Sequence, residues 1–334
     1  MTRIKKRFSI VRDSVFDFSK GMLCFIMVLS HVLDLFGFGV LDGENCILRQ
    51  WIVIVNMPGF FIISGYFFKN TLDRHEMRSI ISGKVKSILW PWLVWDVCIK
   101  MTEYLLGNAG SFPEWIFVDQ VWFLSTLFRI TIVCCILYAC FEDNKICAVV
   151  FVVYLIIARD TSIFVWGFLT GLLCNSFWGH KLAKYREKSS EGVFLIVGVG
   201  AFIVHLLLCY VYLNMAISAD FAQWVKLIAA VLFLIFLLCL ACIIEKTWLF
   251  RVFASLGTET LGMYVVHIVI CYQFGFRIYH KLCMMLFDGR NIFAVSPVIF
   301  EFGTSILWTI LWTVLTYYVV KFMKRTKLRI MLEL

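Results

Sequence analysis

The chain is built from apolar segments of roughly membrane-spanning length that are separated by short polar stretches. A backbone in lipid has to satisfy its own hydrogen bonds, so apolar segments of about 20 residues predict transmembrane helices. Because 62% of the 334 residues are hydrophobic and only 16% are charged, little of the chain remains for a soluble domain. We therefore expect one all-α domain over residues 1–334, a polytopic membrane helix bundle without an appended extracytoplasmic domain. About ten transmembrane helices are predicted, over residues 18–39, 50–68, 86–106, 121–141, 146–158, 162–178, 193–213, 222–244, 260–281 and 298–321.

The distribution of lysine and arginine predicts how this bundle is oriented. If the N-terminus is cytoplasmic, the inner connecting segments hold 23 of the 31 basic side chains and the outer segments hold five. Cytoplasmic loops of membrane proteins carry such an excess, so we expect both termini in the cytoplasm. The same distribution explains the net charge of +9 without a nucleic-acid partner, and we expect none.

The first apolar segment, residues 16–38, carries polar groups that a simple membrane anchor would not need. They are Asp17, Lys20, His31 and Asp34. A charge near the bilayer centre costs roughly 2.5–3.5 kcal/mol on insertion scales. Lys20 and His31 are eleven residues apart, which places them on one helix face about 16 Å apart along the axis. This face, with a cation at its start and an imidazole three turns deeper, is the first candidate for chemistry.

The second segment carries a further cluster of unusual residues. Asn56 and Ser64 add hydrogen-bonding groups, while Pro58, Gly59 and Gly65 are poor choices for a straight helix facing lipid. Two interpretations are open for Ser64 and Gly65: a kinked packing helix, or a site where a ligand approaches the backbone closely.

Other polar residues within the segments have simpler interpretations. Asp96 and Lys100 are four residues apart in the favourable order, so we expect them to neutralise each other. The tryptophans around Pro91 are typical of an interfacial belt. His205 stands alone, and we expect a packing role for it.

The ninth segment contains Tyr264 and His267, which lie three residues apart and so share a helix face. The fourth begins with Trp122, near a membrane face. No set of four cysteines and histidines has the spacing of a zinc site, and no phosphate-binding glycine motif is present, so we expect neither a metal nor a nucleotide-driven pump.

Five short motifs follow one another along the chain. They are Lys-Gly at 20–21 followed by Ser-His at 30–31, Asn-Met-Pro-x-Phe-Phe-x-x-Ser-Gly-Tyr-Phe-Phe at 56–68, Trp-Pro-Trp at 90–92, Trp-Phe-Leu at 122–124 and Leu-Gly-x-Tyr-x-x-His at 261–267. Together these motifs resemble the acyltransferase-3 family of integral-membrane O-acyltransferases, in the branch similar to fucose 4-O-acetylases. Lys20 stands where most of the family has arginine, and Asn56 where many members have histidine.

The resemblance implies a membrane O-acetyltransferase that uses cytoplasmic acyl-CoA, most often acetyl-CoA, and acylates a hydroxyl of a cell-surface or lipid-linked saccharide. Lys20 would meet the phosphates of the donor as a point charge, and His31 would act as general base or as acyl carrier. Asp34 would orient the imidazole if it faces the ring. The expected site residues are His31 and Asp34 for catalysis, Lys20, Asp17 and Trp122 for donor binding, and Asn56, Ser64, Tyr264 and His267 for lining the substrate site.

Two other functions remain open at this point. A transporter or flippase for a lipid-linked oligosaccharide would also be a bundle with intramembrane charges, although transport does not call for the Lys20 and His31 face. A membrane glycosyltransferase would need acidic catalytic motifs and larger outer loops than this sequence has. We expect a bacterial inner membrane as the location and membrane lipid as a partner, and the sequence is compatible with a homo-oligomer.

Overall fold

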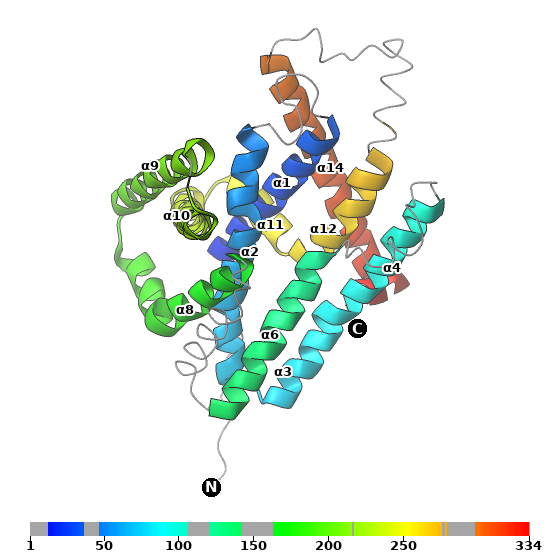
Figure 1. Ribbon diagram of the computed structural model, residues 1–334, viewed down its shortest axis with the longest axis horizontal. Coiled ribbons are helices and arrows are strands. Elements are labelled where there is room, and N and C mark those ends of the chain that lie inside the picture. The colour runs from blue at the N-terminus through cyan, green and yellow to red at the C-terminus, as the bar shows by residue number, and fades with distance from the viewer. Residues whose placement is uncertain are drawn as a thin grey trace.

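The computed structural model describes residues 13–36, 47–105, 121–141, 163–215, 217–275, 278 and 298–333, and these residues form helices and no strand (Figure 1). The helices, with the short π and 3₁₀ segments marked η, are α1 Ser14–Phe36, α2 Ile47–Arg74, α3 Met77–Lys84, η3 Val85–Leu89, α4 Trp90–Leu105, α6 Trp122–Phe141, α8 Ile163–Lys188, α9 Glu191–Asn214, α10 Ala219–Ile244, α11 Trp248–Gly257, α12 Thr260–His267, η4 Ile268–Gly275, α14 Val298–Arg325 and η6 Lys327–Met331.

The expectation of an all-helical membrane protein is confirmed for the described residues. Five of their helices are long and apolar enough to cross a membrane, and a bent pair of helices, α11 with α12, raises the number to six. Nine of the predicted segments coincide with helices, whereas the segment 146–158 lies outside the described residues. The number of ten spans and the cytoplasmic placement of both termini stay predictions.

Helix α9 shows how the outer surface of the bundle is built. It packs mainly on α10, and the two helices lie at the periphery (Figure 1). Only 22% of its most apolar stretch is buried, and side chains such as Ile196 and Leu207 are more than half exposed. Apolar surface of this extent would be costly in water, so we infer that this face meets lipid.

Glycines let α2 and α8 touch through their backbones at two places. A Cβ atom at Gly65 of α2 would lie 1.9 Å from the carbonyl oxygen of Phe168 in α8, and one at Gly171 of α8 would lie 1.8 Å from the oxygen of Ile62. No such contact is tolerated, so only glycine fits. Gly65 therefore belongs to a packing interface, which is one of the two interpretations that the sequence left open.

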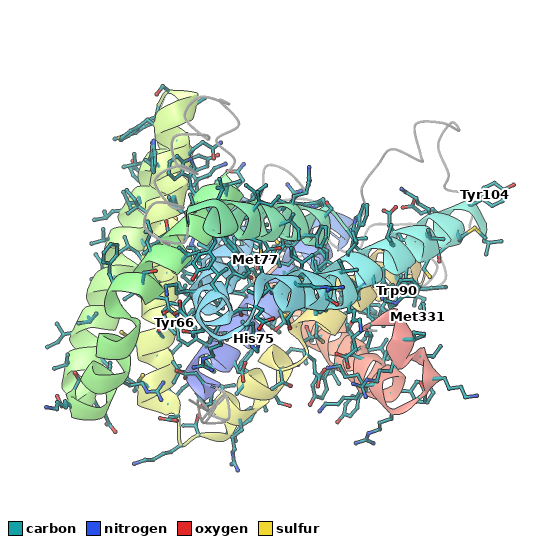
Figure 2. All side chains as sticks on the ribbon, turned by 90° about the horizontal axis from the view of Figure 1, so that it is seen from below. Tyr66, His75, Met77, Trp90, Tyr104 and Met331 are labelled. Carbon is teal, nitrogen blue, oxygen red and sulfur yellow. The ribbon has the colours of Figure 1, made fainter. Side chains whose placement is uncertain are left out.

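The tryptophans around Pro91 do more than line an interface. The indole N–H groups of Trp90 and Trp95 donate hydrogen bonds to the carbonyl oxygens of Ile330 and Met331, at 2.6 and 2.8 Å. Figure 2 shows Trp90 beside Met331. The interfacial-belt interpretation is thus incomplete, because these two side chains fasten the C-terminal segment η6 to α4.

The π segment η3 accounts for a proline inside a continuous helical stretch. It lies directly before Trp90 and Pro91, where the helix passes from α3 into α4. Proline cannot donate the backbone hydrogen bond of a regular α-helix, and a π turn is one way to absorb that loss. The predicted span 86–106 is therefore the second part of a longer helical element that begins at Met77.

Two packing predictions made for isolated polar residues are confirmed. The ammonium group of Lys100 lies 2.6 Å from a carboxylate oxygen of Asp96 in the same helix. His205 is fully buried, where it accepts a hydrogen bond from Trp51 at 2.7 Å and donates one to the oxygen of Ala229 at 2.9 Å. Both groups are satisfied locally, so neither needs a ligand.

One prediction about the connecting segments is wrong. Residues 245–259 connect the predicted helices 222–244 and 260–281 and were expected to be a loop, but Trp248–Gly257 form the helix α11. Thr247 caps it by accepting a hydrogen bond from the amide of Phe250, and Phe250 and Leu256 are buried. With 10 residues, α11 is too short to be recognised as a membrane span by its apolar length.

Candidate functional site

Helix α12 runs beside α1, and three contacts show which residues of the two segments lie at the same level. A Cβ atom at Gly257 would lie 1.7 Å from the backbone oxygen of Asp17. One step further along, the side chain of Thr260 lies close to that of Cys24. At the far end, the rings of His267 and His31 are 5.1 Å apart between centroids. Residues 257–267 therefore follow α1 from the level of Asp17 to that of His31.

The chain turns sharply where α11 ends and α12 begins, and we call this turn, residues 257–259, the α11–α12 corner. The axes of the two helices differ by 72°. Glu259 is buried and forms ion pairs with Lys324 at 2.6 Å and Lys321 at 3.5 Å, both in α14. A carboxylate at the start of a helix also interacts favourably with the helix dipole. These charges fix the direction in which α12 leaves the corner.

A cavity of about 240 Å³ lies next to this corner. Its walls come from α1, α2, α6 and the residues around the corner. Most of the wall is apolar, and a few groups that donate or accept hydrogen bonds project from it, which is the usual composition of a binding pocket. The lining residues are Lys20, Phe60, Ile63, Ser64, Phe123, Leu127, Gly257, Thr258, Thr260, Leu261 and Tyr264.

Lys20 is the charged residue of this wall. Its ammonium nitrogen lies 2.6 Å from a carboxylate oxygen of Asp17, and 5.9 Å from the centroid of the Phe67 ring. The carboxylate is almost fully buried, whereas the lysine side chain is 23% exposed. An ammonium group has three donors, so the contact with Asp17 leaves donors that can serve a ligand. Asp17, which does not itself line the cavity, thus holds the Lys20 side chain in place.

Tyr264 connects the cavity to the two histidines. Its hydroxyl accepts a hydrogen bond from the backbone amide of Phe123 at 3.3 Å, and its ring lies 5.1 Å from the ring of Phe123. On its other side the ring lies 5.9 Å from that of His267. The helical spacing of Tyr264 and His267 thus brings them to one face, as the sequence indicated.

His31 and His267 are neighbours across the interface between α1 and α12. Their rings are tilted by 41° at the 5.1 Å separation. His267 is 1% exposed, and its Nδ1 lies 3.0 Å from the carbonyl oxygen of Met263. Neither imidazole lines the cavity, whose wall ends at Tyr264. His31 thus faces another helix of the bundle, one residue layer beyond the cavity.

Two further predicted site residues, Asn56 and Trp122, do not line the cavity. Asn56 is buried in α2, and its Oδ1 has no hydrogen-bond partner among the described residues. The ring of Trp122 packs 5.0 Å from that of Phe164 and does not line the cavity. The backbone of Asp34 belongs to α1, but its side chain lies outside the described part of the structure.

Two hydroxyl groups of the wall were not singled out from the sequence. Thr258 and Thr260 donate hydrogen bonds to the backbone oxygens of Ser255 and Gly257, at 2.7 and 2.6 Å. They flank Glu259 in a polar stretch between two glycines. This stretch is the sequence feature that could have pointed to them as site residues. In the described ranges no group of three or more His, Cys, Asp or Glu side chains could hold a metal ion.

Comparison with known proteins gives a family and two partial relatives. A family model described as an acyltransferase domain matches residues 13–320. The chain is 32% identical to nodulation protein NolL of Sinorhizobium fredii over 95 residues, which are 28% of this chain and 25% of the relative. It is 28% identical to nodulation protein NolL of Mesorhizobium japonicum over 119 residues, 34% of this chain and 30% of the relative. The matches thus span about a third or less of the relatives' length. No solved structure matches the chain.

Proposed function

The chain belongs to the acyltransferase-3 family, and from that membership we propose that it transfers an acetyl group from cytoplasmic acyl-CoA to a hydroxyl of a cell-surface or lipid-linked saccharide. The observation that carries the proposal is the cavity beside the α11–α12 corner. It has Lys20 on its wall, and Tyr264 links it to the pair of His31 and His267.

Lys20 is proposed to meet the donor. The N-terminal end of α1 faces the cytoplasm in the orientation that the loop charges predict. Lys20 keeps donors for a ligand beyond its contact with Asp17. We expect those donors to bind phosphate or pantetheine oxygens, while the flexible arm of the donor lies along the apolar part of the wall, which includes Phe60, Ile63 and Leu127.

His31 is proposed to act as the general base, because imidazole is the side chain best suited to accept a proton near neutral pH. The acceptor oxygen bonds to the carbonyl carbon of the thioester as its proton moves to His31. The carbon–sulfur bond then breaks, and the CoA thiolate takes the proton from His31 and leaves as the thiol. A covalent acyl-His31 intermediate is the second route to the same products.

Acetyl transfer by the full chain tests this function. Membranes that contain the protein should consume radiolabelled acetyl-CoA and label a saccharide or glycolipid fraction. His31→Ala should abolish the transfer while the protein still inserts and purifies. Acetyl-CoA consumption that does not differ between membranes with and without the protein would remove the proposal and favour the transporter.

A charge series at Lys20 tests donor binding separately. Lys20→Glu should raise KM for acetyl-CoA by at least about tenfold, because a single charged hydrogen bond is worth about 1.5–3 kcal/mol. Lys20→Arg keeps the charge and should raise KM far less. Equal effects of the two substitutions would mean that Lys20 does not meet the donor.

A further inference from the structure

His267 has one ring nitrogen engaged and the other available. Nδ1 lies 3.0 Å from the carbonyl oxygen of Met263. A carbonyl can only accept, so Nδ1 carries the hydrogen, and in the neutral ring Nε2 is then a bare acceptor. Nε2 is buried and has no hydrogen-bond partner among the described residues.

A buried acceptor without a partner calls for an explanation, because nearly all such groups are satisfied in folded proteins. The hydroxyl of the adjacent Tyr264 accepts a hydrogen bond from the amide of Phe123 at 3.3 Å and forms no hydrogen bond to Nε2 of His267. The polar ring in contact with His267 from the opposing helix is that of His31, at 5.1 Å between centroids. An imidazole N–H is a donor of the kind that Nε2 lacks.

We propose that His267 is a positioning residue for His31: its Nε2 accepts the ring N–H of His31 during the reaction. That hydrogen bond holds His31 in the tautomer whose other nitrogen is basic and turns this nitrogen toward the acceptor hydroxyl. When the hydroxyl proton arrives, the resulting imidazolium keeps its hydrogen bond to His267 until the CoA thiolate removes the proton. The inference rests on the proposed function, in which His31 is the base.

His267 would take the part that the sequence assigned to Asp34. In serine hydrolases a buried carboxylate orients the histidine and stabilises its protonated form. A neutral imidazole provides weaker electrostatic support but costs less to bury in a membrane protein than an ion does. The α11–α12 corner then has a catalytic consequence, because it sets the register that places His267 opposite His31.

Two substitutions separate orientation from packing. In His267→Asn, the shorter amide can still donate to the oxygen of Met263, but no atom occupies the place of Nε2. In His267→Gln, the longer side chain brings an amide oxygen near that place, where it accepts a hydrogen bond. The probes are acetyl-CoA and a lipid extract of the host, with the purified full chain in proteoliposomes.

We expect His267→Asn to lower kcat by about 10–100-fold with little change in KM for acetyl-CoA, and His267→Gln to recover most of the lost rate. A kcat for His267→Asn that stays near the wild-type value, or equal losses in the two variants, would overturn the inference. If His267→Asn does not fold, His267→Gln decides alone: a kcat within about tenfold of wild type supports orientation, and loss to background contradicts it.

Asp34→Asn is the comparison variant. If Asp34 orients His31, this variant shows the loss in kcat and His267→Asn does not, which would also overturn the inference. A different result would contradict the proposed function. Full activity in His31→Ala would show that His31 is not the general base. Activity that is lost in His31→Ala but intact in His267→Asn leaves the function in place and removes only the role of His267.

Discussion

Ser64 and Gly65 are neighbours in the sequence but serve different purposes. Ser64 lines the cavity, whereas Gly65 allows α2 to contact the backbone of α8. Successive residues of a helix point about 100° apart, so one can face a ligand while the next faces another helix. Gly65 therefore fits the packing interpretation, whereas a ligand contact at Ser64 stays a prediction.

Gly65→Ala should destabilise the protein strongly. The new Cβ would lie 1.9 Å from the oxygen of Phe168, so α2 and α8 would have to separate, at an expected cost of about 1–3 kcal/mol or more. The matched control is Gly83→Ala, because a Cβ at Gly83 meets nothing within 4 Å. Alanine there favours the helix by up to about 1 kcal/mol. Thermal unfolding in detergent checks both, and similar midpoints for the two variants would contradict the packing role.

Substitutions at Ser64 test the cavity as a binding site. Ser64→Phe should fill part of the space of about 240 Å³ and abolish acetyl transfer, although the protein folds. Ser64→Ala removes one hydroxyl and should cost about 0.5–1.5 kcal/mol of binding at most. Transfer rates and KM for acetyl-CoA measure the difference. Normal activity of the phenylalanine variant would place the donor elsewhere.

Among the elements, the pair α11 and α12 does most to shape the site. Its corner contributes residues to the cavity wall, and α12 carries Tyr264 and His267 along α1. The corner is tied to α1 through Gly257 and to α14 through Glu259. A helix pair bent by 72° is held by these contacts, so its direction depends on residues from three parts of the chain.

Glu259→Gln should loosen the corner and lower both stability and activity. It removes the charge that pairs with Lys324 at 2.6 Å, in a place where the glutamate is 7% exposed. We expect a loss of about 1–3 kcal/mol and a lower kcat, because His267 loses its register. Glu333→Gln, which breaks the exposed pair with Arg329, is the control and should change stability by less than about 1 kcal/mol. A shift no larger than in the control would show that Glu259 does not hold the corner.

At the scale of the whole molecule, the lipid-facing surface and the charge distribution must be compatible with the same orientation of the bundle in the membrane. Exposed apolar side chains mark the sides of the bundle, as on α9, and the basic residues gather in the segments predicted to be internal. The C-terminal segment η6 is fastened to Trp90 and Trp95 of α4. The predicted inner side of the bundle thus includes both the start of α4 and the C-terminal end of α14.

Both termini should be cytoplasmic in a bacterial host. A green fluorescent protein fused after residue 334 should fluoresce, and alkaline phosphatase at the same place should be inactive, because the 23-to-5 bias of basic residues retains that side in the cytoplasm. The opposite pattern, with an active phosphatase, would show that the bundle has the inverse orientation in the membrane. Lys20 would then lie at the wrong end of α1 for a cytoplasmic donor.

The helices and the family motifs could be predicted because both are local in sequence. Apolar length locates a span, and helical spacing puts Tyr264 beside His267 and Lys20 on the face of His31. The helix α11 was missed because it is too short to be a span, and its stability comes from packing against α1. Trp122 was expected at the donor site on its motif, but its ring packs against α8.

By itself, the sequence determined that this is a helical membrane protein, how its charges bias its orientation, and which residues share a helix face. Only the tertiary structure decided which faces meet. His31 and His267 are 236 residues apart along the chain, and their contact depends on a glycine crossing, an ion pair at the corner and the direction of α12. The periodicity of a helix predicts which residues share one of its faces. Which other helix that face contacts depends on the packing of all the helices together.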